Sequence, residues 1–141
     1  MKPYITIIAG IPASGKTTYA RHIAKQLHIP LIGKDAIKEK LYDVINYDTS
    51  KRENSQLYGA ASYSVFFHIS ECLMEVDVSF VLESNFTSAS ADILIPLVEK
   101  YSYPLRSFCV GEKITVDTTD FSKVDYNKID KLAKNFIENQ K

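Results

Sequence analysis

The sequence predicts an α/β fold, a three-layer sandwich with helices on both faces of a mainly parallel sheet of about five strands. Three observations support this class. Short β-branched or apolar runs alternate with longer amphipathic segments, as in folds built from βαβ units. The first run, YITIIA at residues 4–9, is apolar almost throughout, which is typical of a strand buried on both faces. The length of 141 residues suits one domain.

The elements are expected to follow one another without a linker or an internal repeat, so that residues 1–141 form a single domain. Strands are predicted at residues 4–9, 30–32, 79–82, 105–110 and 114–117, and helices at 15–27, 35–44, 51–76, 88–100 and 124–139. Asp35 is the expected N-cap of the second helix, and the fourth has to accommodate Pro96, a residue type that kinks helices. The long third helix should turn a broad apolar face inward, with Leu57, Ala60, Ala61, Ser64, Phe67 and Cys72.

Composition excludes several classes of protein. Lysine and arginine balance aspartate and glutamate, 17 against 17, so no net field attracts nucleic acid or an anionic membrane. The apolar runs are shorter than the roughly 20 residues that span a bilayer, and the N-terminus lacks a signal-peptide pattern. We expect a cytoplasmic protein with no membrane partner and with nucleic acid as an unfavoured partner.

Cysteine and histidine are not expected to form a metal site. Cys72 and Cys109 lie in apolar surroundings, which predicts buried, reduced thiols. The three histidines, His22, His28 and His68, show no metal-ligand spacing with the cysteines or with each other.

Residues 10–17 carry the most specific motif of the chain. They fit G-x-x-x-x-G-K-[ST], with the members Gly10, Ile11, Pro12, Ala13, Ser14, Gly15, Lys16 and Thr17. Glycines in such a loop let the backbone curl until successive N–H groups point at phosphate oxygens. The lysine reaches the β- and γ-phosphates, and the last hydroxyl coordinates Mg²⁺. Because a strand precedes the loop and an amphipathic helix follows it, the sequence predicts a P-loop NTPase sandwich that binds ATP with Mg²⁺. Thr18 either contacts the α-phosphate or continues the helix.

Two carboxylates follow predicted strands at the edge of the sheet where α/β folds bind ligands. Asp35, after the second strand, could orient and deprotonate an acceptor hydroxyl, a role compatible with capping its helix. Glu83, at the end of the third strand, could hold the water shell of the metal. The structural alternative is a solvated glutamate at a strand end.

Asn85 and Lys38 are candidate substrate residues. Asn85 lies just beyond Glu83 and either contacts the substrate or shapes the turn. Lys38 falls one helical turn after Asp35 on the same face, and could bind an anionic group of the substrate. An exposed helix lysine is the more frequent case.

Three segments together resemble the kinase branch of the P-loop proteins: GIPASGKTT at 10–18, KDAIKEKL at 34–41 and VLESNF at 81–86. The chain is similar to the predicted ATP-binding kinases grouped with bacteriophage polynucleotide kinase, zeta toxins and gluconate-kinase-like phosphotransferases. The likeness covers about residues 3–110. It implies transfer of the ATP γ-phosphate to a substrate hydroxyl. It also implies roles for Lys16 and Thr17 on the triphosphate and Mg²⁺, Asp35 on the hydroxyl, Lys38 on the substrate side and Glu83 as the third-strand acid.

The chain departs from this family between residues 110 and 114. Family members carry there a helix, a mobile lid with one or two arginines and another helix, whereas here only Gly111, Glu112 and Lys113 intervene. Parallel neighbouring strands need a crossover of about a dozen residues, while three residues suit a hairpin. The strand at 114–117 is therefore expected to pair antiparallel at the sheet edge, which we favour, or to swap into the sheet of a second copy.

The missing lid leaves two functions open. The chain has three arginines, Arg21, Arg52 and Arg106, and none follows Arg106. An arginine that neutralises the transferring phosphoryl group contributes a factor of about 10³ to 10⁵ in rate. The chain is therefore either an ATP-dependent kinase for an unidentified hydroxyl-bearing acceptor, or a lid-less nucleotide-binding protein, natural or engineered, that transfers phosphate very slowly.

Overall fold

The computed structural model describes residues 2–45, 48, 50–103, 125, 127 and 131. Its strands are β1 (Ile5–Ala9), β2 (Leu31–Gly33) and β3 (Phe80–Ser84), and its helices are α1 (Lys16–Leu27), α2 (Lys34–Val44), α3 (Arg52–Glu75) and α4 (Ser88–Lys100). The predicted α/β class with a parallel sheet is confirmed. The predicted strands at 105–110 and 114–117 and most of the helix at 124–139 lie outside the described residues, so the five-stranded sheet, its hairpin and the swapped strand stay predictions.

The three strands run parallel in the order β1-β3-β2. In this register Ala9 lies opposite Ser84, and Gly33 lies opposite Glu83. All of β3 is buried, as expected for a central strand with a neighbour on each side and helices on both faces. The carboxyl ends of the strands therefore bring the loop after β1, the start of α2 and the residues after β3 to one edge of the sheet.

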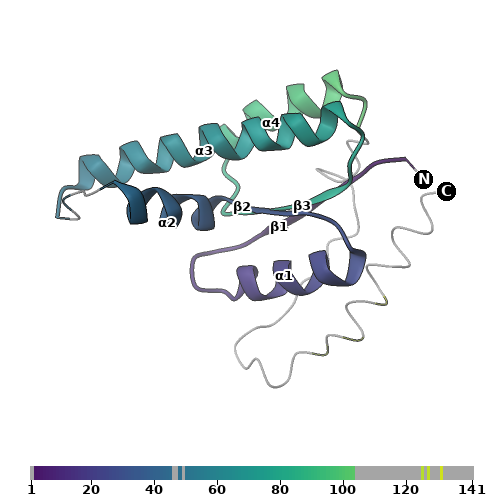
Figure 1. The fold of residues 1–141 in the computed structure, drawn as a ribbon, viewed down its shortest axis with the longest axis horizontal. Coiled ribbons are helices and arrows are strands. Elements are labelled where there is room, and N and C mark those ends of the chain that lie inside the picture. Colours follow the sequence, from purple (N-terminus) through teal and green to yellow (C-terminus); the bar gives the residue numbers. More distant parts are fainter. Residues whose placement is uncertain are drawn as a thin grey trace.

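Helices cover both faces of the sheet (Figure 1). On one face, α1 packs its apolar stripe (Ala20, Ile23 and Ala24) against Ile8 and Val81. On the other, α3 and α4 enclose a larger core with Phe66, Phe67, Met74, Phe80, Leu82, Leu94 and Val98. α2 packs along α3, and the two helices extend together beyond the carboxyl end of the sheet (Figure 1).

Element boundaries agree with the sequence predictions to within two residues, but the predicted N-cap is wrong. α2 begins at Lys34, directly after β2, and its N-cap is the extended residue Gly33. Asp35 therefore lies in the first turn of the helix, where a carboxylate still interacts favourably with the helix dipole.

The predicted inward face of α3 is confirmed at Phe67 and wrong for the other residues named for it, which are exposed. Its buried residues are Ser62, Phe66, Phe67, Ser70 and Met74, whereas Leu57 is 67% exposed and Cys72 is an exposed free cysteine. The prediction of buried thiols therefore fails for Cys72, and Cys109 lies outside the described residues. The cause is that α3 carries apolar residues on more than one side, so their spacing alone does not identify the face that meets the sheet.

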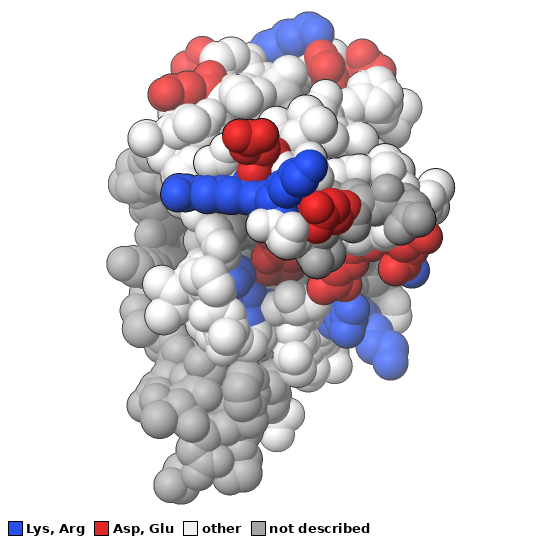
Figure 2. Space-filling view, turned by 90° about the vertical axis from the view of Figure 1, so that its left-hand side faces the viewer, with Lys and Arg blue, Asp and Glu red and all other residues white. Residues whose placement is uncertain are grey.

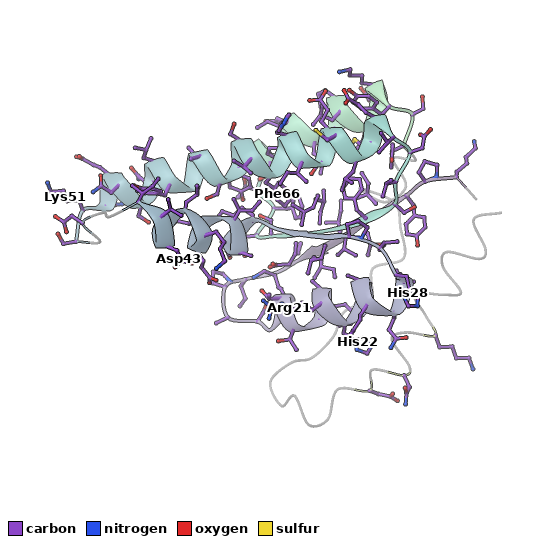
Figure 3. All side chains as sticks on the ribbon, in the orientation of Figure 1. Arg21, His22, His28, Asp43, Lys51 and Phe66 are labelled. Carbon is purple, nitrogen blue, oxygen red and sulfur yellow. The ribbon has the colours of Figure 1, made fainter. Side chains whose placement is uncertain are left out.

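Truncating Phe66 is expected to destabilise the fold strongly. The side chain is fully buried between α3 and the sheet (Figure 3) and meets the ring of Phe67 edge-on at 5.3 Å between centroids. Phe66→Ala should lower the free energy of unfolding by about 3–5 kcal/mol in urea titrations. The control Val44→Ala, at an 83% exposed position, should change it by less than about 0.5 kcal/mol. Equal effects of the two substitutions would contradict this placement of the core.

Candidate nucleotide site

The loop at residues 10–15 connects β1 to α1 at the carboxyl edge of the sheet. Gly15, which precedes α1, has a φ of 79°, in the left-handed region that favours glycine. At Gly10 a Cβ would lie 3.1 Å from Ser14 Oγ and 3.3 Å from Lys16 Cδ. Glycine at this position therefore leaves room for the lysine stem to fold over the loop, and the N-terminus of α1 faces the same space.

Lys16, Thr17 and Glu83 converge beside this loop. Lys16 Nζ donates a hydrogen bond to the Ile11 carbonyl oxygen at 3.0 Å and lies 4.0 Å from Glu83 Oε1. Thr17 Oγ1 donates to Glu83 Oε2 at 3.4 Å. β2 ends beside them on Gly33, where a Cβ would approach Glu83 Oε2 to 3.1 Å. The structure thus brings together the three side chains that the sequence assigned to the triphosphate and the metal.

The Glu83 carboxyl is buried, with 2% of its side chain exposed. Burial raises its pKa above the ordinary value of 4.5, and the charge of Asp35 adds to the rise, while Lys16 and the hydrogen bond from Thr17 oppose it. A cation bound between Glu83 and Thr17 would favour the ionised carboxylate.

This pKa makes the stability of the ligand-free protein depend on pH. A carboxyl with a raised folded-state pKa binds more protons in the folded than in the unfolded chain, so stability is lost as pH rises from about 4.5 through the folded pKa. Glu83→Gln should remove this loss. As the pH rises from about 4.5 through the folded-state pKa of Glu83, the melting temperature of the variant should therefore fall less than that of the wild type. Melting curves at successive pH values, without nucleotide or Mg²⁺, measure the difference. An equal change of melting temperature with pH in the two proteins would contradict a raised pKa of Glu83.

Lys34 is a site residue that the sequence reasoning did not single out. Its Nζ donates to Asp35 Oδ1 at 2.7 Å and lies 5.3 Å from the centre of the Tyr63 ring. The Tyr63 and Ser84 hydroxyls are 3.0 Å apart. Tyr63 of α3 thus contacts both β3 and Lys34, the residue that pairs with Asp35. The lysine side chain is 14% exposed and the Asp35 side chain 48%. Lys34 could have been found in the sequence because it lies next to Asp35. Nothing in the sequence distinguishes Tyr63 from the other aromatic residues of its helix.

The other predicted residues have mixed placements. Thr18 is exposed in the first turn of α1, and its contact with the α-phosphate stays a prediction. Lys38 is directed to α3, where its Nζ donates to Ser55 Oγ at 3.1 Å, rather than to Asp35. The side-chain oxygen of Asn85 is buried and accepts no hydrogen bond from the described residues. A substrate role for Lys38 or Asn85 stays a prediction.

The donor set fits a magnesium nucleotide. Mg²⁺ is usually bound through one or two protein oxygens, with phosphates and waters completing its shell. Thr17 Oγ1 and the Glu83 carboxylate supply oxygens of this kind. The part of the chain that the structure describes holds no cluster of three or more His, Cys, Asp or Glu side chains able to bind a metal.

The surface around this end of the sheet carries mixed charge. Lysine, arginine and acidic side chains are interspersed on the face shown in Figure 2 and form no continuous basic stripe there. Among the helices of the described residues, none is both long and apolar enough to cross a membrane.

Comparisons with known proteins match the part of the chain that contains the candidate site. A family model described as an AAA domain matches residues 5–101, a range that contains every predicted site residue. The chain is similar to a solved structure described as a "putative kinase" from Chloroflexus aurantiacus J-10-fl, with 30% identity and a TM-score of 0.68. That match covers 73% of this chain and 55% of the other, so this chain spans about half the length of that protein. No curated protein matches the chain.

Proposed function

This chain belongs to the AAA-domain family, and from that premise we propose that it binds ATP with Mg²⁺ and transfers the γ-phosphate to a hydroxyl group of an acceptor. A kinase-like P-loop nucleotide-binding role is supported by the family match and by the similarity to the Chloroflexus protein. The observation that carries the finer proposal is the convergence of Lys16, Thr17 and Glu83 beside the loop.

Nucleotide binding would use groups that already face one another. The backbone N–H groups of the loop, which Pro12 lacks, and the N-terminus of α1 would receive the phosphates. The Lys16 ammonium would exchange its hydrogen bond to the Ile11 carbonyl for one to a phosphate oxygen. Thr17 and Glu83 would hold Mg²⁺, which when bound neutralises charge on the β- and γ-phosphates.

Transfer would depend on Asp35 at the start of α2. In a phosphoryl transfer to a hydroxyl, the bond between the γ-phosphorus and the bridging oxygen breaks while a bond to the acceptor oxygen forms. Asp35 would orient that hydroxyl and accept its proton. Lys34, at 2.7 Å from Asp35 Oδ1, holds the carboxylate in place. Half of the Asp35 side chain remains exposed, which leaves it accessible to an acceptor.

A second function, nucleotide binding with very slow transfer, is favoured by the arginine content. Only three arginines occur in the chain, and none follows Arg106. Arg21 and Arg52 are both exposed, on α1 and at the start of α3 (Arg21 is labelled in Figure 3). Without an arginine at the transferring group, the rate could fall by about 10³ to 10⁵.

A transfer assay distinguishes the two functions. The full chain is incubated for hours with Mg²⁺, ATP labelled at the γ-phosphate and one of several acceptors, among them sugars, sugar acids, nucleosides and oligonucleotides with a free 5′-hydroxyl. Labelled acceptor that disappears in Asp35→Asn supports the kinase. ATP binding without labelled product from any acceptor supports the slow or inactive nucleotide binder.

A further inference from the structure

The ion pair of Lys34 and Asp35 joins two adjacent residues of α2. Side chains at adjacent positions of a helix point about 100° apart around its axis and do not face each other. Lys34 Nζ nevertheless donates to Asp35 Oδ1 at 2.7 Å. The Lys34 side chain is 14% exposed, whereas that of Lys40, which pairs with Asp43 on the same helix, is 83% exposed. Groups outside α2 therefore cover Lys34 and leave its ammonium beside Asp35.

The ring of Tyr63 on α3 is the contact that covers the lysine. Lys34 Nζ lies 5.3 Å from the centre of this ring, within the range of a cation–π interaction. Such an interaction is stronger for a cation that is partly removed from water, as Lys34 is. The ring thus favours the position in which the ammonium also reaches Asp35.

Tyr63 is itself held by three further contacts. Its ring lies nearly parallel to that of Phe67, at 5.9 Å between centroids and 17° between planes. It meets the ring of Phe66 edge-on at 6.1 Å. Its hydroxyl lies 3.0 Å from the hydroxyl of Ser84, which is buried. Because Phe66 and Phe67 belong to the main core, the core and β3 together determine where the tyrosine ring lies.

The contacts of Tyr63 reach the two elements that carry the proposed functional carboxylates. Ser84 directly follows Glu83 on β3, and Lys34 directly precedes Asp35 on α2. Phosphoryl transfer needs the group beside the phosphates and the base at the acceptor in a fixed arrangement, because a displacement of about 1 Å can lower the rate about 100-fold. Tyr63 connects the two sides of that arrangement.

We propose, on the basis of the transfer function proposed above, that Tyr63 is a positioning residue: its ring directs Lys34, and Lys34 holds the Asp35 carboxylate in the orientation that accepts the proton of the acceptor. The hydrogen bond to Ser84 ties this arrangement to the strand that carries Glu83. Because the effect of Tyr63 passes through the Lys34 ammonium, it should disappear in a variant that lacks this charge.

A double-mutant cycle on kcat tests this route. With ATP and acceptor saturating, Tyr63→Leu should lower kcat about tenfold and leave ATP affinity unchanged, because the base remains but is no longer held. In a Lys34→Met background the same substitution should change kcat by less than about twofold. A second loss of about tenfold in that background would mean that Tyr63 acts through packing alone, and this result would overturn the proposal.

Two further variants separate the ring from its surroundings. Tyr63→Phe keeps the ring beside Lys34 and loses only the hydrogen bond to Ser84, so kcat should stay within about threefold of the wild type. Tyr101→Leu removes a ring at the far end of α4 that also lies near a lysine, with Lys100 Nζ at 4.7 Å from its centre, and should leave kcat unchanged. Equal losses in Tyr63→Phe and Tyr63→Leu would contradict the role of the ring.

NMR tests the contact itself without relying on activity. In the ligand-free protein the ring current of Tyr63 should shift the ε-methylene protons of Lys34 upfield, and Tyr63→Leu should abolish the shift while Tyr63→Phe keeps it. A wild type without this shift would overturn the proposal even if it transfers phosphate. A wild type that shows the shift and binds ATP, but labels no acceptor, would overturn the transfer function and the positioning role with it.

Discussion

Replacing Lys16 by alanine is expected to weaken ATP binding at least about 100-fold, a loss of about 2.7 kcal/mol. The ammonium group is already directed to the loop, where it donates to the Ile11 carbonyl, and its side chain is 7% exposed. A cation held in this position gives charge-assisted hydrogen bonds to phosphate, which are stronger than neutral ones. Titration calorimetry with ATP and Mg²⁺ measures the change.

Two variants separate this loss of binding from a loss of folding. Lys16→Met keeps an apolar stem beside Gly10 but removes the charge, and should bind ATP as weakly as Lys16→Ala. Lys25→Ala removes an exposed lysine from the last turn of the same helix and should bind ATP as the wild type does. Wild-type affinity in Lys16→Met would show that the ammonium does not contact the triphosphate.

Replacing Asp35 by asparagine is expected to slow phosphoryl transfer by about 10² to 10⁴ while ATP affinity changes little. The amide keeps the size of the side chain but cannot accept the proton of the acceptor hydroxyl. Asp43→Asn is the matched control, since it changes an exposed acidic residue at the far end of α2 (Figure 3). Transfer rates at saturating ATP measure both.

The contact between Lys34 and Asp35 offers a second explanation for slower transfer in Asp35→Asn. Asp35→Asn also deprives Lys34 of its carboxylate partner, so Lys34→Met is measured beside it. We expect Lys34→Met to reduce transfer less than Asp35→Asn, because the base remains and only its orientation is affected. Unchanged transfer in Asp35→Asn would leave Asp35 with a role in the first turn of α2 and none in the chemistry.

Most of the described part of the fold could be predicted from the sequence because its strong signals are local. The apolar run before the loop, the glycines at 10 and 15 and the pattern at residues 16–27 define β1, the turn and α1 without knowledge of the rest of the chain. The inward face of α3 was mispredicted, apart from Phe67, because contacts with the sheet and α4 decide which side of the helix is buried. Leu57 and Phe67 are both apolar, and only tertiary packing decides that the second is buried.

The site was predictable where position along a strand determines it. Glu83 follows an apolar run, and parallel strands bring such ends to one edge beside Thr17. The Asp35 cap was misplaced because β2 runs one residue further and leads directly into α2. The Lys34–Asp35 ion pair and the Tyr63–Ser84 contact depend on how α2 and α3 pack at that edge, which no spacing in the sequence specifies.

Titrating the wild-type chain with ATP, with and without Mg²⁺, tests the proposed nucleotide site most directly. We predict one ATP bound per chain, with affinity at least about tenfold lower when Mg²⁺ is removed and at least about 100-fold lower for AMP, which lacks the phosphates that Lys16 would contact. An absence of ATP binding, or equal affinity for ATP and AMP, would contradict the assignment of residues 10–17 as a triphosphate site.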